Sequence, residues 1–151
     1  MKNKRLILIR HAHRDTELHS LDNGLSEKGK KQVKQLVNYS LGKELKGAVF
    51  LTSPKKRCVE TITPVAAAFG AKVNVELALG EGCSSALLDA FIDQWKYKGE
   101  EVTVACSHGD IIPMLVEKLT GGVISIKKAA WCEIELVGRD CYLTWLVQKY
   151  E

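Results

Sequence analysis

The sequence predicts an α/β fold: a three-layer sandwich with a mostly parallel central sheet, helices on both faces and a C-terminal antiparallel hairpin. Short apolar runs of strand length alternate along the chain with longer segments of helical periodicity. Several of the short runs are continuously apolar, as in strands that are buried on both faces. Two strand-like runs also flank a final turn at residues 138–140. We therefore expect residues 1–151 to form a single domain.

The first predicted strand covers residues 5–10 (RLILIR), where four consecutive aliphatic residues leave no polar face. A helix follows, with Ser26 at its start and apolar residues at helical spacing as far as about Leu45. Residues 47–53 (GAVFLTS) form the second buried strand. These segments make the first strand–helix–strand unit of the sheet.

The second predicted helix begins directly after this strand. Ser53 is a favourable N-cap, Pro54 suits the first helical position, and Gly70 suits the C-terminal end. Pro64 falls inside the helix and is expected to kink or divide it, because proline removes a backbone hydrogen bond.

The remaining elements continue the alternation. They are a strand at 71–77, a helix at 84–99 capped by Ser84 or Ser85, a strand at 101–107, a helix from about 110 to 119, and hairpin strands at 130–138 and 141–149. Strands that alternate with helices favour parallel pairing, and the hairpin is expected to add an antiparallel edge.

Composition and charge narrow the class of protein. Hydrophobic residues make up 46% of the chain and charged residues 26%, which is typical of a globular domain. The formal charge of +4 suits an anionic ligand, but lysine and arginine are scattered, which argues against a nucleic-acid partner. The apolar run that follows MKNKR ends at Arg10, too early for a signal peptide or a membrane span. We expect a cytoplasmic protein with no membrane partner.

The five cysteines are scattered and include no C-x-x-C pair. This pattern argues against a zinc site or a dithiol redox motif and favours reduced thiols. We expect neither a bound metal nor a cofactor.

Reactive side chains follow the predicted strands, at the point where each strand ends. In open α/β sheets, ligands bind beyond the carboxyl ends of the strands, so we expect these residues to meet at one rim. They are Arg10 and His11 after the first strand, Ser53 and Arg57 after the second, Glu81 after the third, and Ser107, His108 and Gly109 after the fourth.

These residue types together suit phosphoryl transfer. The two arginines can bind the oxygens of a phosphoryl group through several N–H donors. A neutral imidazole can attack phosphorus, a second can stabilise charge on the oxygens, and a carboxylic acid can protonate the leaving group. The sequence thus predicts metal-independent hydrolysis through a covalent phosphohistidine.

Four stretches, LIRHA, LTSPKKRCVET, LGEG and CSHGD, resemble the motifs of the histidine phosphatase superfamily, in the same order. GLSEKGKKQVKQL is similar to the family's L-T-x-x-G-x-x-Q-A-x-x-L helix. The superfamily includes cofactor-dependent phosphoglycerate mutases and small phosphohistidine phosphatases of the SixA type. The resemblance implies that His11 is the nucleophile, that Arg10, Arg57 and His108 complete the phosphate pocket, and that Glu81 is the proton donor. Ala12 stands where the family more often has glycine.

Several residues have competing interpretations. Glu76 and Asp15 are alternative proton donors. His13 and Arg14 either line the mouth of the substrate site or face water, and His19 is interpreted as a loop residue. Ser53 and Ser107 either cap helices or help to bind phosphate.

A metal hydrolase that uses His11, His13 and Asp110 is a third hypothesis. We disfavour it because arginines at the strand ends would repel a cation.

The segment between Glu81 and His108 holds one helix and one strand, whereas the larger mutase-like relatives carry a long insertion there. A short segment predicts an open pocket, which favours a phosphatase over a mutase and admits a phosphorylated protein. Imidazole is also a good leaving group, with a pKa near 6.5. The preferred substrate is phosphohistidine on a protein, followed by a small phosphomonoester. The alternatives are a non-catalytic phosphate- or phosphoprotein-binding module and a small-metabolite mutase or phosphatase.

Overall fold

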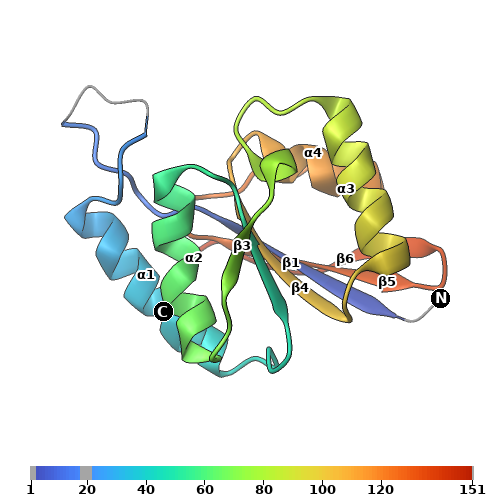
Figure 1. Ribbon diagram of the computed structural model, residues 1–151, viewed down its shortest axis with the longest axis horizontal. Coiled ribbons are helices and arrows are strands. Elements are labelled where there is room, and N and C mark those ends of the chain that lie inside the picture. The colour runs from blue at the N-terminus through green and yellow to red at the C-terminus, as the bar shows by residue number, and fades with distance from the viewer. Residues whose placement is uncertain (1–2, 18–21, 151) are drawn as a thin grey trace.

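The computed structural model describes residues 3–17 and 22–150, so His19 lies outside the described residues. Within them the chain forms one six-stranded sheet with helices on either side (Figure 1). The strands are β1 (Lys4–Arg10), β2 (Val49–Thr52), β3 (Val73–Val75), β4 (Val102–Ser107), β5 (Trp131–Val137) and β6 (Asp140–Val147). The helices are α1 (Glu27–Leu41), α2 (Lys56–Ala68), α3 (Ser85–Lys98) and α4 (Ile111–Thr120), with a short 3₁₀ turn, η1 (Leu77–Leu79).

The strand order is β3-β2-β4-β1-β5-β6. The first four of these strands pair in parallel, whereas β5 is antiparallel to β1 and β6 is antiparallel to β5. This topology confirms the predicted α/β fold with a mostly parallel sheet and an antiparallel hairpin at one edge. It also places β1 and β4 side by side at the centre, with β2 next to β4.

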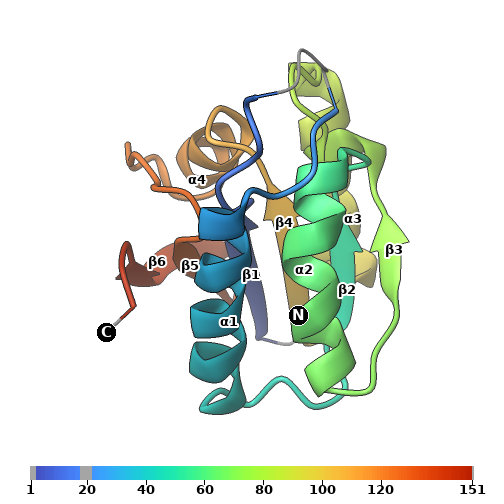
Figure 2. The ribbon, with the colours of Figure 1, turned by 90° about the vertical axis from the view of Figure 1, so that its left-hand side faces the viewer.

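Helices cover the sheet on both faces, with α1 and α2 on one side and α3 and α4 on the other (Figure 2). Alternate residues of β1 supply the two cores, because successive side chains of a strand point to opposite faces. Leu6 and Leu8 pack in the cluster with α3 and α4, whereas Ile7 and Ile9 pack in the cluster with α1 and α2. All four side chains are fully buried, which explains why this strand lacks a polar face.

The start of α2 differs from the prediction. The helix begins at Lys56 with Lys55 as its N-cap, so the prediction that Ser53 caps it is wrong. The Ser53 hydroxyl instead lies within hydrogen-bond distance of a ring nitrogen of His108. The helix also continues past Pro64 without division. Pro64 is on the exposed face, where water can satisfy the carbonyl oxygen that loses its partner.

Two other elements are shorter than predicted. Helix α1 ends at Leu41 rather than near Leu45, and Gly42 closes it through backbone hydrogen bonds. The third strand ends at Val75, because the side chain of Glu76 accepts a hydrogen bond from the Ala78 N–H and starts the turn η1.

All five cysteines are free thiols. Of the three tryptophans, Trp95 and Trp131 are buried, whereas Trp145 is exposed on the edge strand β6. Within residues 3–17 and 22–150, no helix has both the length and the apolar character needed to span a membrane.

Candidate active site

Two histidines meet where the central strands end. Arg10 at the end of β1 pairs in register with Ser107 at the end of β4, so the next residues, His11 and His108, leave the sheet together. Their ring centroids are 5.4 Å apart with an interplanar angle of 61°. Both side chains are buried, so the reactive groups lie below the molecular surface.

His11 is held in one neutral form. Its Nδ1 lies 2.7 Å from the carbonyl oxygen of Ala12, which can only accept, so Nδ1 carries the hydrogen and Nε2 is unprotonated. Burial lowers the pKa of His11 to about 3, and the nearby Arg57 contributes to the shift, whereas the hydrogen bond to Ala12 opposes it. At neutral pH, Nε2 therefore has a free lone pair.

His108 is held by polar partners from α2 and the segment before it. Its Nε2 lies 2.8 Å from the Ser53 hydroxyl and 3.6 Å from Sγ of Cys58. A hydrogen bond with Cys106 lowers the pKa of the Cys58 thiol, and His108 adds to the shift, although burial opposes it. The sequence analysis did not single out Cys58. Cys58 follows Arg57 directly at the start of the same predicted helix, and this position could have indicated that its thiol lies near the site.

The guanidinium groups of Arg57 and Arg10 have unused donors. Arg57 is only 3% exposed, and its Nη2 forms an ion pair with the carboxylate of Glu81. Arg10 donates from Nη1 to the carbonyl oxygen of Ile126 at 2.7 Å. Nε and Nη1 of Arg57 and Nε of Arg10 are buried and meet no acceptor among the described residues. A buried N–H donor without an acceptor lowers the stability of the folded protein. An anion with several oxygens would supply acceptors for all three donors.

Of the three candidate acids, Glu81 forms an ion pair with Arg57, a predicted phosphate-binding residue. Its side chain is 52% exposed. Glu76 is engaged with the backbone of η1, and Asp15 accepts a hydrogen bond from the Glu17 N–H at 2.9 Å. Asp110, which follows the CSHGD motif, attracts Arg10 and accepts from the Gly82 N–H at 3.4 Å.

His13 and Arg14 make their contacts beside α1. Nδ1 of His13 lies 2.7 Å from the Ser26 hydroxyl, and its backbone N–H donates to Gln32. Arg14 pairs with Leu25 in an isolated bridge. Within residues 3–17 and 22–150, neither side chain forms a hydrogen bond, ion pair or ring contact with His11 or His108.

Two supporting residues connect the strand ends. The Thr61 hydroxyl accepts from the Ala12 N–H at 2.9 Å and donates to the Arg57 carbonyl oxygen at 2.7 Å. Thr61 is the threonine of the SPKKRCVET stretch. At Gly109, a Cβ atom would lie 2.7 Å from Cζ of Arg10, so a side chain there would displace the guanidinium group of Arg10.

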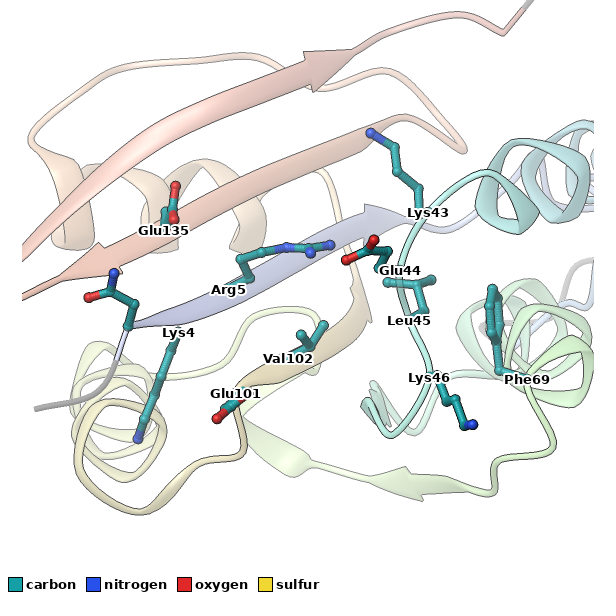
Figure 3. A pocket seen from close by; sticks show the side chains of 11 residues that line it. Lys4, Arg5, Lys43, Glu44, Leu45, Lys46, Phe69, Glu101, Val102 and Glu135 are labelled. Carbon is teal, nitrogen blue, oxygen red and sulfur yellow. The ribbon is translucent and has the colours of Figure 1, made fainter.

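A separate cavity of about 570 Å³ lies at the opposite end of the sheet, where β1 and β4 begin (Figure 3). It contains both acidic and basic side chains, among them Arg5, Lys43 and Glu44. None of the predicted site residues lines it. Across residues 3–17 and 22–150, no group of three or more His, Cys, Asp or Glu side chains is arranged to hold a metal ion.

Known proteins resemble this chain in sequence pattern and in fold. Residues 6–87 match the model of the histidine phosphatase superfamily (branch 1), whereas no curated protein sequence matches the chain. The fold is similar to that of a putative alpha-ribazole-5'-P phosphatase from Escherichia coli, with a TM-score of 0.81, 16% identity and 95% of each chain covered.

Two further solved structures share the fold. The protein histidine phosphatase SixA, complexed with tungstate, has a TM-score of 0.82 and 18% identity over 95% of this chain and 96% of its own. A mycobacterial glucosyl-3-phosphoglycerate phosphatase, complexed with inorganic phosphate, has a TM-score of 0.71 and 18% identity over 94% of this chain and 96% of its own.

Proposed function

Because this chain is a phosphatase that belongs to the histidine phosphatase superfamily, we propose that it hydrolyses its substrate through a phosphohistidine formed on His11. One observation carries the proposal. An unprotonated Nε2 on a buried, neutral imidazole lies in a site where the guanidinium groups of Arg10 and Arg57 hold buried N–H donors that lack acceptors. A nucleophile beside unsatisfied donors suits attack on a phosphoryl group.

The proposed reaction has two displacements at phosphorus. In the first, the Nε2 lone pair of His11 forms a bond to phosphorus while the bond to the leaving group breaks, and the leaving group gains a proton. In the second, the oxygen of water bonds to phosphorus while the bond between phosphorus and Nε2 of His11 breaks, so that phosphate is released and the neutral imidazole is restored. The arginines and His108 stabilise charge on the oxygens that do not react. Each step needs only the protein, the substrate and water, and we expect activity to persist in a chelator.

The preferred substrate is phosphohistidine carried by a protein. The carboxylate of Glu81 is paired with the guanidinium group of Arg57, so it is engaged with that group rather than with a leaving group. An imidazole leaving group tolerates this, because its pKa is near 6.5, whereas an alkoxide leaving group depends on a strong acid. SixA, which shares the fold, is a protein histidine phosphatase. A small phosphate ester is the second candidate, since other proteins of this fold act on such compounds.

The proposal includes a cytoplasmic location. It is supported by the five free thiols, because disulfides are rare in reducing compartments.

The decisive experiment traps the intermediate. The protein is mixed briefly with a phosphohistidine peptide labelled on phosphorus, quenched at high pH and mapped by mass spectrometry. We expect label on His11, and no label in His11→Ala. His13→Ala is the matched control, because His13 is a neighbouring imidazole with other partners, and it should label normally. Label retained in His11→Ala, or no label in the wild type despite phosphate release, would contradict the mechanism. Phosphate bound without release would instead indicate a binding module.

A further inference from the structure

A second feature lies beside the rim: an open cleft of about 590 Å³, which we call the basic cleft. Six of the residues that line it are lysine or arginine, and no carboxylate lines it. They come from four parts of the chain: the end of β1, the start of α1, the segment before β5 and the segment after β6. They are Arg10, Lys28, Lys31, Lys127, Lys128 and Lys149.

The lysines of the basic cleft lack carboxylate partners within the described part of the chain. Burial lowers the pKa of Lys128, and the nearby cations Arg10, Arg14 and Lys28 lower it further. The cations therefore repel one another, and an anion placed among them would relieve that repulsion.

The wall that carries Lys127 and Lys128 is held in place. Arg10 donates to the carbonyl oxygen of Ile126, and Gln148 accepts from the Lys127 N–H at 2.8 Å and donates to the Ser125 carbonyl oxygen at 2.8 Å. These bonds tie the segment before β5 both to the rim and to the segment after β6. A site whose walls are already ordered loses less conformational entropy when it binds a partner.

The cavity at the other end of the sheet differs from the basic cleft in the charges of its lining, because it contains carboxylates as well as cations. Its lining includes the carboxylates of Glu44, Glu101 and Glu135 (Figure 3). Two of its cations, Arg5 and Lys43, also pair with Glu133, at 3.5 Å and 3.3 Å. The basic cleft, by contrast, has six cations and no carboxylate in its lining.

We propose that the basic cleft binds acidic side chains of the phosphorylated protein, close in sequence or space to the phosphohistidine that enters the rim. Arg10 belongs to both places, so a partner whose phosphoryl group reaches the rim brings its neighbouring residues over the lysines. The cleft is open and its lining includes no tryptophan, tyrosine or phenylalanine, which disfavours single-stranded nucleic acid, since that partner stacks its bases on aromatic rings. This inference rests on the proposed function.

The test uses two double variants of equal charge. Lys28→Gln/Lys128→Gln alters the basic cleft, and Lys72→Gln/Lys98→Gln removes two exposed lysines outside it. Three substrates are compared at low ionic strength: a phosphohistidine peptide with three Asp or Glu residues beside the histidine, the same peptide with Asn or Gln there, and p-nitrophenyl phosphate.

We expect the cleft variant to lose about tenfold or more in kcat/KM on the acidic peptide, with less than about twofold change on the other two substrates. The loss should shrink as salt is added, because salt screens charge. The control variant should match the wild type on all three. An equal change on both peptides, or an equal loss in the control variant, would overturn the proposal.

A binding experiment distinguishes failure of the proposed function from failure of the role given to the basic cleft. It uses fluorescence anisotropy to measure how tightly the protein binds the acidic peptide without its phosphoryl group. If the wild type hydrolyses no substrate but binds this peptide through the cleft lysines, the proposed function fails and the cleft assignment stands. If it hydrolyses both phosphopeptides but does not distinguish them, the cleft assignment fails alone. A single-stranded oligonucleotide that binds more tightly than the peptide, in a manner dependent on Lys28 and Lys128, would contradict the choice of partner.

Discussion

The Ser53 hydroxyl lies 2.8 Å from Nε2 of His108, and this contact joins the end of β2 to the end of β4. It is possible because Thr52 and Cys106 pair in register, and the Ser53 N–H continues the ladder to the Cys106 carbonyl oxygen at 3.0 Å. Ser53 therefore orients the second imidazole of the site instead of capping α2.

Replacing Ser53 with alanine should remove this orientation. We expect Ser53→Ala to lower kcat/KM on p-nitrophenyl phosphate by about tenfold or more and to destabilise the protein by about 1–3 kcal/mol, because a buried ring nitrogen loses a partner. Ser40→Ala is the control, since its buried hydroxyl donates to the Val37 carbonyl oxygen away from the site. It should lower stability without lowering kcat/KM. Equal activity losses in both would contradict the role given to Ser53.

Gly109 should not tolerate a side chain. The new Cβ in Gly109→Ala would lie 2.7 Å from Cζ of Arg10 and displace its guanidinium group. We expect kcat/KM to fall by roughly tenfold to a hundredfold, because small displacements of binding groups are costly in phosphoryl transfer. In Gly42→Ala the Cβ would lie 3.6 Å from the Tyr39 carbonyl oxygen, an ordinary contact, and activity should be unchanged. Wild-type kinetics in Gly109→Ala would show that Arg10 is not needed.

The Thr61 hydroxyl should be needed for stability, since it satisfies the Ala12 N–H and the Arg57 carbonyl oxygen. Thr61→Val keeps the shape but leaves the buried N–H unsatisfied, so we expect a loss of about 1–3 kcal/mol in the free energy of unfolding. Thr61→Ser keeps the hydroxyl and should recover most of that loss. Denaturant titration measures both. A valine variant as stable as the serine variant would be evidence against this bridge.

The stability of the protein should fall in acid through His11. The folded state binds a proton at this ring only near pH 3, whereas the unfolded chain binds one near pH 6.5. Below pH 6.5 the unfolded state thus binds more protons, and the free energy of unfolding decreases as pH falls, by up to about 1.4 kcal/mol per pH unit.

His11→Asn should lack this contribution. Between pH 7 and pH 5, we expect the wild type to lose about 2 kcal/mol more than the variant, as measured by urea unfolding at each pH. Parallel losses in the two proteins would mean that the folded imidazole titrates normally.

Glu81 should matter more for esters than for phosphohistidine. Glu81→Gln removes the carboxyl proton donor while nearly keeping the side-chain shape. We expect roughly a hundredfold loss in kcat/KM on a simple alkyl phosphate and less than about fivefold on a phosphohistidine peptide, because imidazole leaves with little assistance. Asp110→Asn is a suitable comparison, since its carboxylate also lies at the rim. Equal losses of Glu81→Gln on both substrates would contradict the leaving-group argument.

Much of the fold was predictable from local pattern. The uninterrupted apolar stretch from Leu6 to Ile9 required a strand that is buried on both faces, and that requirement implies helices on either side. The same reasoning predicted that His11 and His108 would lie close together, because parallel strands end at a common edge.

The sequence by itself determined that a parallel sheet would carry His11, His108 and two arginines at one rim, because hydrophobic periodicity sets the strands and their ends. Only the tertiary structure decided which side chains contact one another. The Ser53 hydroxyl contacts His108, and Glu81 pairs with Arg57. Lys28 and Lys128 line the same cleft. Such pairings depend on the register of strands and on loop paths between residues far apart in the chain, and no short-range pattern encodes them.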